Sequence, residues 1–97
     1  MDVRVEIDGQ AFVWDSAKGE ANVVKHGVRF EEAATAFFDP LFVVVDASRI
    51  HEARQAIIGF DSRSRLLFVV HVTLDADELR LISARRATYS EECRYAE

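Results

Sequence analysis

The residues best suited to chemistry lie where a predicted strand ends. The apolar pair Leu81-Ile82 leads through two small residues into two adjacent arginines, Arg85 and Arg86. Guanidinium groups stay charged at every biological pH and form forked hydrogen bonds to phosphate oxygens better than lysine does. Phosphate is therefore the first class of ligand that this junction indicates.

Whether Arg85 and Arg86 act together depends on the backbone around them. In a continuous strand their side chains would point to opposite faces. The segment from Thr88 to Glu91 matches a helix capping box, so a helix is predicted to begin there, and a turn just after Arg86 would loosen the alternation. The other interpretation is that both arginines are solvated or pair with acids such as Glu91.

Length and composition predict one compact domain. The chain has 97 residues, of which 49% are hydrophobic, and this suits a single modest core over residues 1–97. No apolar run is long enough to cross a membrane, and the acidic, charged start does not resemble a secretory signal. We therefore expect a cytoplasmic protein without membrane contact. The single cysteine, Cys93, has no partner in the chain for a disulfide and is expected to be a packing residue.

The charge balance argues against a general nucleic-acid binder. The formal net charge is -5, and nonspecific affinity for a polyanion depends on clustered Lys and Arg. The charges are unevenly distributed, however. Residues 1–48 carry 4 basic and 9 acidic side chains, whereas residues 49–97 carry 8 arginines and 8 acids. A local basic site in the second half remains compatible with an acidic whole.

The predicted elements place helices before most of the strands. Short strands at 3–7 and 12–14 precede a helix from Asp15 or Ser16 to His26, which should end at Gly27. A second helix is predicted over 30–38. Strands are then expected at 41–46, 53–60, 66–74 and 79–85, followed by a short C-terminal helix. This order predicts an α+β domain in which the N-terminal helices pack on one face of an antiparallel sheet.

Several local patterns together carry a family resemblance. They are, in order, Trp14-Asp15, Lys18, Asn22, Lys25-His26-Gly27-Val28, Phe30-Glu31-Glu32-Ala33, Asp39-Pro40, Glu52, Arg54, Gly59, the run from Ile82 to Thr88, Glu91, Arg94 and Tyr95. From about Phe12 to its end the chain resembles the BrnT toxins. Two departures stand out: residues 1–11 form an N-terminal extension, and Arg29 replaces a helix-capping serine, which should weaken the second helix slightly.

The resemblance implies a fold and a function. The fold would be RelE-like, and the activity would be that of a metal-independent endoribonuclease toxin that inhibits translation. The implied partners are an RNA substrate and a cognate BrnA-like antitoxin that neutralises the toxin. Contact with DNA would be indirect, through the antitoxin in a complex that represses its own promoter, and homo- or hetero-oligomers could form.

Metal-free RNA cleavage requires an acid, a base and a cation. His26 is the best candidate for proton transfer because imidazole titrates near neutral pH, with Lys25 beside it to hold phosphate. Cations in the last turn of a helix are also favoured by the macrodipole without any function. Arg54, Arg85 and Arg86 are predicted to bind phosphate and stabilise the transition state. Glu52 would orient Arg54 or act as the base.

The remaining candidates have more ordinary explanations. His71 lies in an apolar strand and is expected to be a hydrogen-bonded core histidine. His51 could be solvated or catalytic, and Tyr95 could stack on a base or pack against the sheet. The aromatic residues Phe12, Trp14, Phe30, Phe37 and Phe38 are interpreted as core. The spacing of the three histidines predicts no metal site, and no cofactor is expected.

Two other functions compete with the ribonuclease. The chain could be a toxin-like module that binds an antitoxin and tunes its DNA binding without catalysis, which would suit the acidic charge. It could also be a small oligomerising domain whose arginines only confer solubility. A basic concave face containing Arg54, Arg85 and Arg86 would favour the ribonuclease, whereas scattered arginines would favour the other two.

Overall fold

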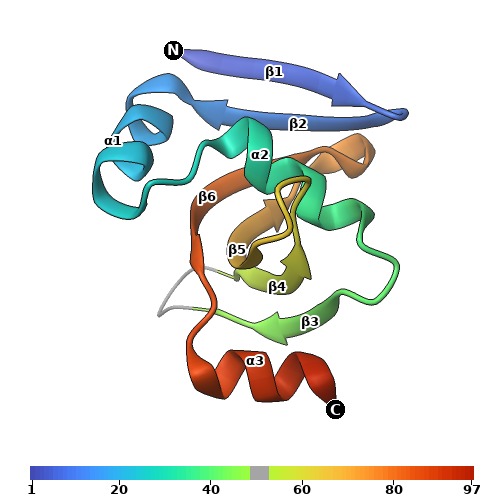
Figure 1. The fold of residues 1–97 in the computed structure, drawn as a ribbon. Helices are drawn as coiled ribbons and strands as arrows, with labels where there is room; N and C mark the ends of the chain where they lie inside the picture. The colour runs from blue at the N-terminus through green and yellow to red at the C-terminus, as the bar shows by residue number, and fades with distance from the viewer. Residues whose placement is uncertain (49–52) are drawn as a thin grey trace.

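A mixed sheet organises the chain, which a computed structural model describes for residues 1–48 and 53–97. Within these residues the sheet has six strands in the order β1-β2-β6-β5-β4-β3 (Figure 1). The strands are β1 (Asp2–Ile7), β2 (Gln10–Asp15), β3 (Val43–Asp46), β4 (Gln55–Phe60), β5 (Leu66–Thr73) and β6 (Leu79–Arg86). The helices are α1 (Ser16–His26), α2 (Phe30–Ala34) and α3 (Tyr89–Ala96), with short 3-10 turns η1 (Thr35–Phe38) and η2 (Asp75–Asp77).

The expected antiparallel sheet is wrong at one pair of strands. β2 and β6 run parallel, with Phe12 opposite Leu79 and Val13 opposite Arg80, whereas the other neighbouring pairs are antiparallel. A short turn forces consecutive strands to be antiparallel, but β2 and β6 are far apart in the chain and no turn constrains their direction. The N-terminal hairpin thus joins the sheet beside the last strand.

The predicted N-terminal extension forms part of this sheet. Residues 2–7 pair with β2 across a tight turn in which Asp8 and Gly9 both have positive φ, at 49° and 84°. The apolar side chains of Val3, Val5 and Ile7 pack against the buried core. The extension therefore covers apolar surface.

The boundaries of α1 confirm the sequence prediction. The Asp15 carboxylate accepts a hydrogen bond from the Lys18 N–H at 3.1 Å, and Gly27 ends the helix with φ of 71°. These two caps fix where α1 begins and ends, and they place Lys25 and His26 in its last turn.

The second predicted helix is divided in two. α2 gives way to η1 at Thr35, whose hydroxyl donates to the Glu32 carbonyl at 2.5 Å. At the start of α2, Arg29 supplies no side-chain acceptor, and only the Glu32 carboxylate reaches back to the Arg29 N–H, at 3.4 Å. The first turn of α2 therefore lacks half of a capping box, as the sequence predicted.

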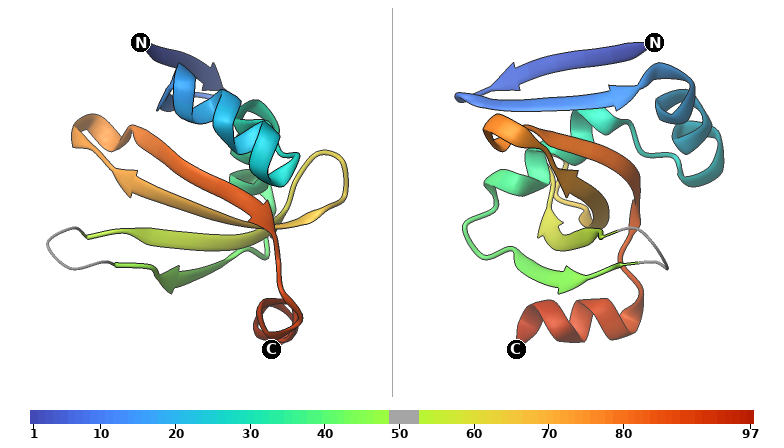
Figure 2. Two further views of the ribbon diagram at one scale, coloured as in Figure 1. Left: turned by 90° about the vertical axis from the view of Figure 1, so that its left-hand side faces the viewer. Right: turned by 180° about the vertical axis from the view of Figure 1, so that it is seen from behind.

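Helices lie on both faces of the sheet, in contrast to the predicted single covered face. Ala84 of β6 is buried and contacts Asn22 of α1, whereas the next residue, Arg85, binds Glu91 of α3. Because neighbouring strand residues point to opposite faces, α3 lies on the far side of the sheet from α2 and the core beneath it. Figure 2 shows α3 separated by the sheet from α1 and α2.

The main core fills the α1 and α2 side. Phe12, Trp14 and Phe30 are buried there, and Phe37 packs partly buried against them. Phe38 is the wrong prediction in this set because it is 41% exposed. Cys93 is likewise exposed rather than packed. No helix in the described residues is both long and apolar enough to span a membrane.

Candidate functional site

Arg85 and Arg86 point to opposite faces of the sheet. β6 runs through both residues, with Phe68 of β5 opposite Arg85 and Leu67 opposite Arg86. The expected loosening of the alternation by a turn is therefore wrong, because the strand persists until the capping box begins at Thr88. The two arginines cannot approach one phosphate from the same face.

Arg85 is held by its neighbours. Its guanidinium lies 4.4 Å from the centre of the Phe68 ring and donates to both carboxylate oxygens of Glu91, at 2.8 and 2.9 Å. The hydrogen bond from Arg85 lowers the pKa of Glu91, and the same bond raises that of Arg85. The alternative interpretation of Arg85 as the ion-pair partner of Glu91 matches the structure.

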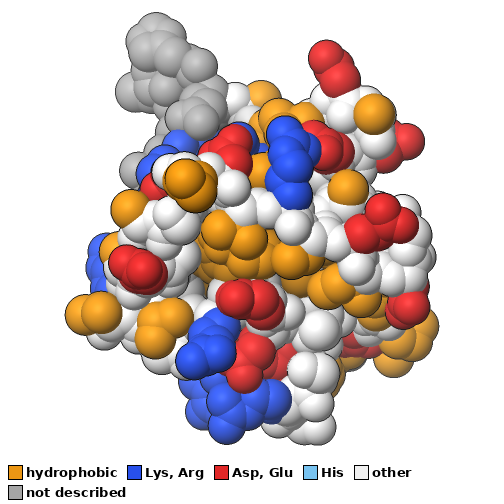
Figure 3. Space-filling model, turned by 90° about the horizontal axis from the view of Figure 1, so that it is seen from above, with side chains coloured by type: hydrophobic (Ala, Val, Ile, Leu, Met, Phe, Trp, Pro, Cys, Tyr) orange, Lys and Arg blue, Asp and Glu red, His pale blue; other side chains and the backbone are white. Residues whose placement is uncertain are grey.

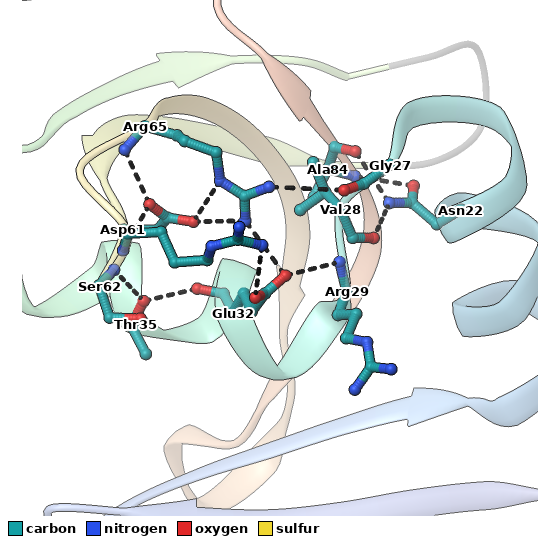
Figure 4. A network of polar contacts seen from close by, with 11 residues as sticks. Asn22, Gly27, Val28, Arg29, Glu32, Thr35, Asp61, Ser62, Arg65 and Ala84 are labelled. Atoms are coloured by element: carbon teal, nitrogen blue, oxygen red, sulfur yellow. Dashed lines mark hydrogen bonds and ion pairs between the residues drawn. The ribbon is translucent and has the colours of Figure 1, made fainter.

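A buried amide joins α1 to β6 next to these arginines. Asn22 is 6% exposed, and its Oδ1 accepts from the Ala84 N–H at 3.1 Å while its Nδ2 donates to the Ala84 carbonyl at 2.9 Å. Nδ2 also donates to the Val28 carbonyl at 2.9 Å (Figure 4). β2 pairs only with the first residues of β6. At Ala84, further along β6, the Asn22 side chain therefore takes the place of a neighbouring strand.

His26, Lys25 and Arg86 gather at one end of the molecule. His26 lies four residues after Asn22, which is one helical turn further along the same face of α1. Arg86 lies two residues after Ala84 on the same face of β6. In the left view of Figure 2, α1 and β6 run in a similar direction and end near each other, and their ends also lie close in Figure 1. His26 is half-buried, and Lys25 and Arg86 are exposed.

Acidic side chains and arginines surround the end of α1. The Arg65 side chain, 13% exposed, donates to Asp61 at 2.7 and 3.0 Å and to Glu32 at 3.1 Å, and it reaches the Gly27 carbonyl at 3.4 Å (Figure 4). Arg63 pairs with Glu32 at 3.3 Å. Burial opposes the charged form of Asp61, but the hydrogen bonds from Arg65 outweigh it, so the pKa of Asp61 is lowered. This network fixes α2 and the loop before β5 beside Gly27.

Tyr95 holds α3 against the sheet. Its hydroxyl donates to Oδ2 of Asp39 at 2.6 Å, and its ring meets the edge of Phe60 with the centres 5.4 Å apart. The hydrogen bond to Asp39 raises the pKa of Tyr95 to about 12. The Asp39 carboxylate also accepts from the backbone of Phe60 and Leu41, at 2.9 Å each. These contacts match the interpretation of Tyr95 as a packing residue.

The structure does not bring Arg54 to the same end as Arg86. Arg54 comes just before Gln55 of β4. Gln55 lies opposite His71 of β5, and His71 lies opposite Leu81 near the start of β6. Arg86 is five residues further along, about 16 Å in an extended strand. The Arg54 N–H donates to Oγ of Ser48 at 3.3 Å, and its side chain lines a cavity of about 500 Å³. Glu52 and His51 lie outside the described residues.

His71 is a core histidine, as the sequence predicted. It is 4% exposed, a ring nitrogen lies 3.3 Å from the Val69 carbonyl, and the ring packs on Phe37 at 4.9 Å between centres. Burial lowers its pKa. Among the described side chains, no three of His, Cys, Asp or Glu converge as metal ligands would.

Five arginines in the described part of the chain are neutralised locally. The arginines in ion pairs with acidic side chains are Arg4, Arg63, Arg65, Arg80 and Arg85. On the face seen from above, basic and acidic side chains alternate around hydrophobic surface instead of forming one basic patch (Figure 3). In contrast, no carboxylate of residues 1–48 or 53–97 lies within ion-pair distance of Lys25 or Arg86.

Sequence reasoning missed the residues that assemble this end of the molecule. Asn22 stood in the family pattern without a role, because an asparagine within a helix usually faces solvent. Arg65, Asp61 and Glu32 are separated in the chain and carry no local pattern. The one available signal for Asn22 was its position one turn before His26 on the face of α1 that meets the sheet.

Comparison with known proteins places the chain in a family. The family described as "Ribonuclease toxin, BrnT, of type II toxin-antitoxin system" matches residues 14–91. The 1.1 Å crystal structure of the Brucella abortus ribonuclease toxin BrnT shares the fold, with a TM-score of 0.61 and 23% identity over 77% of this chain and 92% of that one. No curated protein sequence matches. The chain therefore belongs to the BrnT family of ribonuclease toxins of type II toxin-antitoxin systems.

Proposed function

We propose that this chain is a metal-independent endoribonuclease that inhibits translation until a cognate BrnA-like antitoxin binds it. The match of the BrnT family to residues 14–91 carries the ribonuclease assignment and implies a cognate antitoxin. The cytoplasm is the proposed site of action, because translation takes place there. The fold would be RelE-like, and any contact with DNA would be made through the antitoxin.

Cleavage without metal uses the ribose 2'-hydroxyl next to the scissile phosphate. A base removes its proton, the oxygen attacks phosphorus, and the 5'-oxygen of the next nucleotide leaves with a proton from an acid. The products are a 2',3'-cyclic phosphate and a 5'-hydroxyl. We assign the proton transfers to His26, whose imidazole can act as acid or base, or to Glu52 as the base.

Arg86 and Lys25 are proposed to bind the reacting phosphate. Both are exposed beside the end of α1, and the described part of the chain offers neither one a carboxylate partner. A cation without such a partner can neutralise the additional negative charge on phosphorus in the transition state. This arrangement gives one acid–base group and two cations at the same end of the molecule.

Four other predicted site residues would act from elsewhere. Arg54 is proposed to bind a second phosphate at the opposite end of the sheet from Arg86, and Glu52, which lies outside the described residues, is proposed to orient Arg54 or act as a base. Arg85 and Tyr95 would contribute through α3, because Glu91 and Asp39 already engage them. RNA lying along the sheet could then contact both ends.

The alternative function is a catalytically weak module that binds an antitoxin and modulates its DNA binding. The net charge of -5 favours this alternative, since RNA is a polyanion. The pairing of Arg85 with Glu91 favours it too, because it withdraws a predicted phosphate ligand.

The decisive experiment is RNA cleavage in EDTA at low salt. The purified chain is incubated with total RNA beside His26→Ala, Arg86→Ala and a sample mixed with the cognate antitoxin. Arg80→Ala is the matched control, because Arg80 lies at the other end of β6 and pairs with Asp2 at 3.0 Å. Full cleavage by the wild type and Arg80→Ala, strongly slowed cleavage by His26→Ala and Arg86→Ala, and none in the sample with antitoxin would support the proposal. Intact RNA together with tight antitoxin binding would favour the alternative.

A further inference from the structure

We propose that Asn22 is the positioning residue that fixes His26 beside Arg86 for proton transfer. This inference rests on the proposed ribonuclease function. Asn22 touches no reacting atom in the mechanism above, yet it is nearly fully buried and uses both amide protons and its oxygen in hydrogen bonds to backbone. A side chain with this many fixed partners has one orientation.

The bonds to Ala84 determine where α1 lies along β6. Asn22 accepts from the N–H and donates to the carbonyl of the same residue, at 3.1 and 2.9 Å, as a neighbouring strand would. A shift of α1 by one residue along the strand would break both bonds, because the backbone groups of Arg85 point toward β5. The distance from the end of α1 to Arg86 is thereby fixed.

The third bond fixes the chain on the other side of His26. Nδ2 donates to the Val28 carbonyl at 2.9 Å, two residues after His26. Gly27 between them adopts a left-handed conformation with φ of 71°, so the chain turns back toward Asn22 at once. His26 therefore lies within a loop from Asn22 to Val28 that the Asn22 side chain closes.

Arg65 supports the same loop from outside. Its guanidinium reaches the Gly27 carbonyl at 3.4 Å and is itself held by Asp61 and Glu32. The bond to Gly27 is long, so we treat Arg65 as a support and Asn22 as the main determinant. Neither Arg65 nor Asn22 belongs to the end of β6 that carries Arg86.

Loss of the Asn22 contacts should reduce the rate of cleavage rather than the binding of RNA. A displacement of a catalytic group by about 1 Å can reduce a rate by about 100-fold. Lys25 and Arg86 are long, exposed cations that can still reach phosphate after such a displacement. We therefore expect Asn22→Ala to lower kcat by roughly 10- to 100-fold with little change in KM.

A double-mutant cycle with His26 separates positioning from general destabilisation. If Asn22 acts through His26, then adding Asn22→Ala to His26→Ala lowers kcat no further. A merely structural role would lower the active fraction equally in both backgrounds. Should Asn22→Ala fail to fold, Asn22→Ser, which retains one hydroxyl donor, replaces it in the same cycle.

The chain offers a matched control in Gln10. Its amide also donates to two backbone carbonyls, those of Ala11 at 3.0 Å and Asp77 at 2.7 Å, at the far end of β2 from α1. Asn22→Asp and Gln10→Glu make the same change, from amide to carboxylate facing two carbonyls. We expect Asn22→Asp to lose much of its kcat and Gln10→Glu to keep the wild-type kcat. Both variants should bind uncleavable 2'-O-methyl RNA with equal affinity. Equal loss in both variants would overturn the inference.

Failure of the inference is distinguishable from failure of the proposed function. A wild-type chain that cleaves no RNA contradicts the ribonuclease proposal, and the NMR signals of the His26 imidazole then test the positioning directly. Signals that show one fixed ring orientation in the wild type and averaging in folded Asn22→Ser support it. Identical His26 signals in the two proteins, or an additive cycle in an active enzyme, would refute it.

Discussion

Arg85 of β6 and Glu91 of α3 form a two-point ion pair, in which both guanidinium nitrogens lie within 2.9 Å of a carboxylate oxygen. The pair joins the last strand to the last helix directly through side chains. The pair also occupies Arg85, one of the two adjacent arginines that the sequence predicted to contact phosphate. Because β6 continues through both residues, Arg85 points away from the Arg86 face, and its ion pair with Glu91 secures α3 there.

Replacing Arg85 with alanine should destabilise the fold more than replacing another arginine of β6. We expect Arg85→Ala to lower the free energy of unfolding by about 1–2 kcal/mol, since it removes a half-buried bidentate pair and the contact with Phe68. Arg80→Ala, which breaks a more exposed pair with Asp2, should cost clearly less. Chemical denaturation of both variants measures the difference, and equal effects would contradict the anchoring of α3 by Arg85.

Stability should fall as the pH drops below about 6.5, the ordinary pKa of histidine. Burial lowers the pKa of His71 in the folded state, so as the pH falls the unfolded chain binds a proton at His71 before the folded chain does. The loss begins at the unfolded pKa and continues as the pH falls toward the folded one. Thermal unfolding between pH 5 and 7.5 should show this slope in the wild type. In His71→Leu the slope attributable to this group should vanish; an unchanged slope would exclude His71 as its source.

Alkaline pH should loosen α3 through Tyr95. The raised pKa of about 12 means that this group contributes stability below its unfolded value near 10, and that the contribution is lost as the pH rises through about 12. The wild type should therefore exceed Tyr95→Phe in stability at pH 8, and the difference should shrink as Tyr95 ionises. Urea denaturation at pH 8 and at pH 11 compares the two proteins. A difference that does not change with pH would contradict the contact with Asp39.

The salt dependence of RNA binding should identify the cations that contact phosphate. Each phosphate contact in a single strand contributes about 0.7 to the slope of log affinity against log salt. Arg86→Ala and Lys25→Ala should each reduce the slope for 2'-O-methyl RNA by about this amount. Fluorescence titrations at several salt concentrations measure it, with Arg80→Ala as the variant expected to keep the wild-type slope. An unchanged slope in Arg86→Ala would remove Arg86 from the interface.

Gly59 should not tolerate a side chain. A Cβ added there would lie 2.9 Å from the Ala36 carbonyl oxygen and 3.2 Å from Cβ of Phe42. Since the first of these atoms belongs to the backbone of η1, Gly59→Ala should cost about 1–3 kcal/mol. Gly9→Ala gives a different comparison, because nothing lies near that position and only the positive φ opposes the change. A Gly59→Ala variant as stable as the wild type would contradict the close approach of β4 and η1.

Local signals predicted the elements well. The caps at Asp15, Gly27 and Thr88 are each chemical features of one short segment, and the helices begin and end where those residues indicate. The strands 66–74 and 79–85 were recognised because β-branched and apolar residues dominate them. Such features need no knowledge of the rest of the chain.

Relations between distant segments were the part that the sequence could not supply. The parallel pairing of β2 with β6 leaves no trace in either strand. The placement of α3 on the second face depends on Arg85, which points away from the Arg86 face because β6 continues through both residues. The sequence indicated which residues were candidates for the site, but not which of them lie close together. His26 and Lys25 at the end of α1 and Arg86 at the end of β6 are far apart in the chain, and the contact of Asn22 with Ala84 joins these two elements across 62 positions.

That separation has a consequence for the order of events during synthesis. A ribosome makes α1 first, and Ala84 of the strand that Asn22 binds is added 62 residues after Asn22. Until then the His26 loop lacks the partner that fixes it, and β2 has no sixth strand beside it. A nascent chain therefore lacks the Asn22–Ala84 contact until β6 has left the exit tunnel, and this delays any cleavage of RNA close to the ribosome that is making the chain.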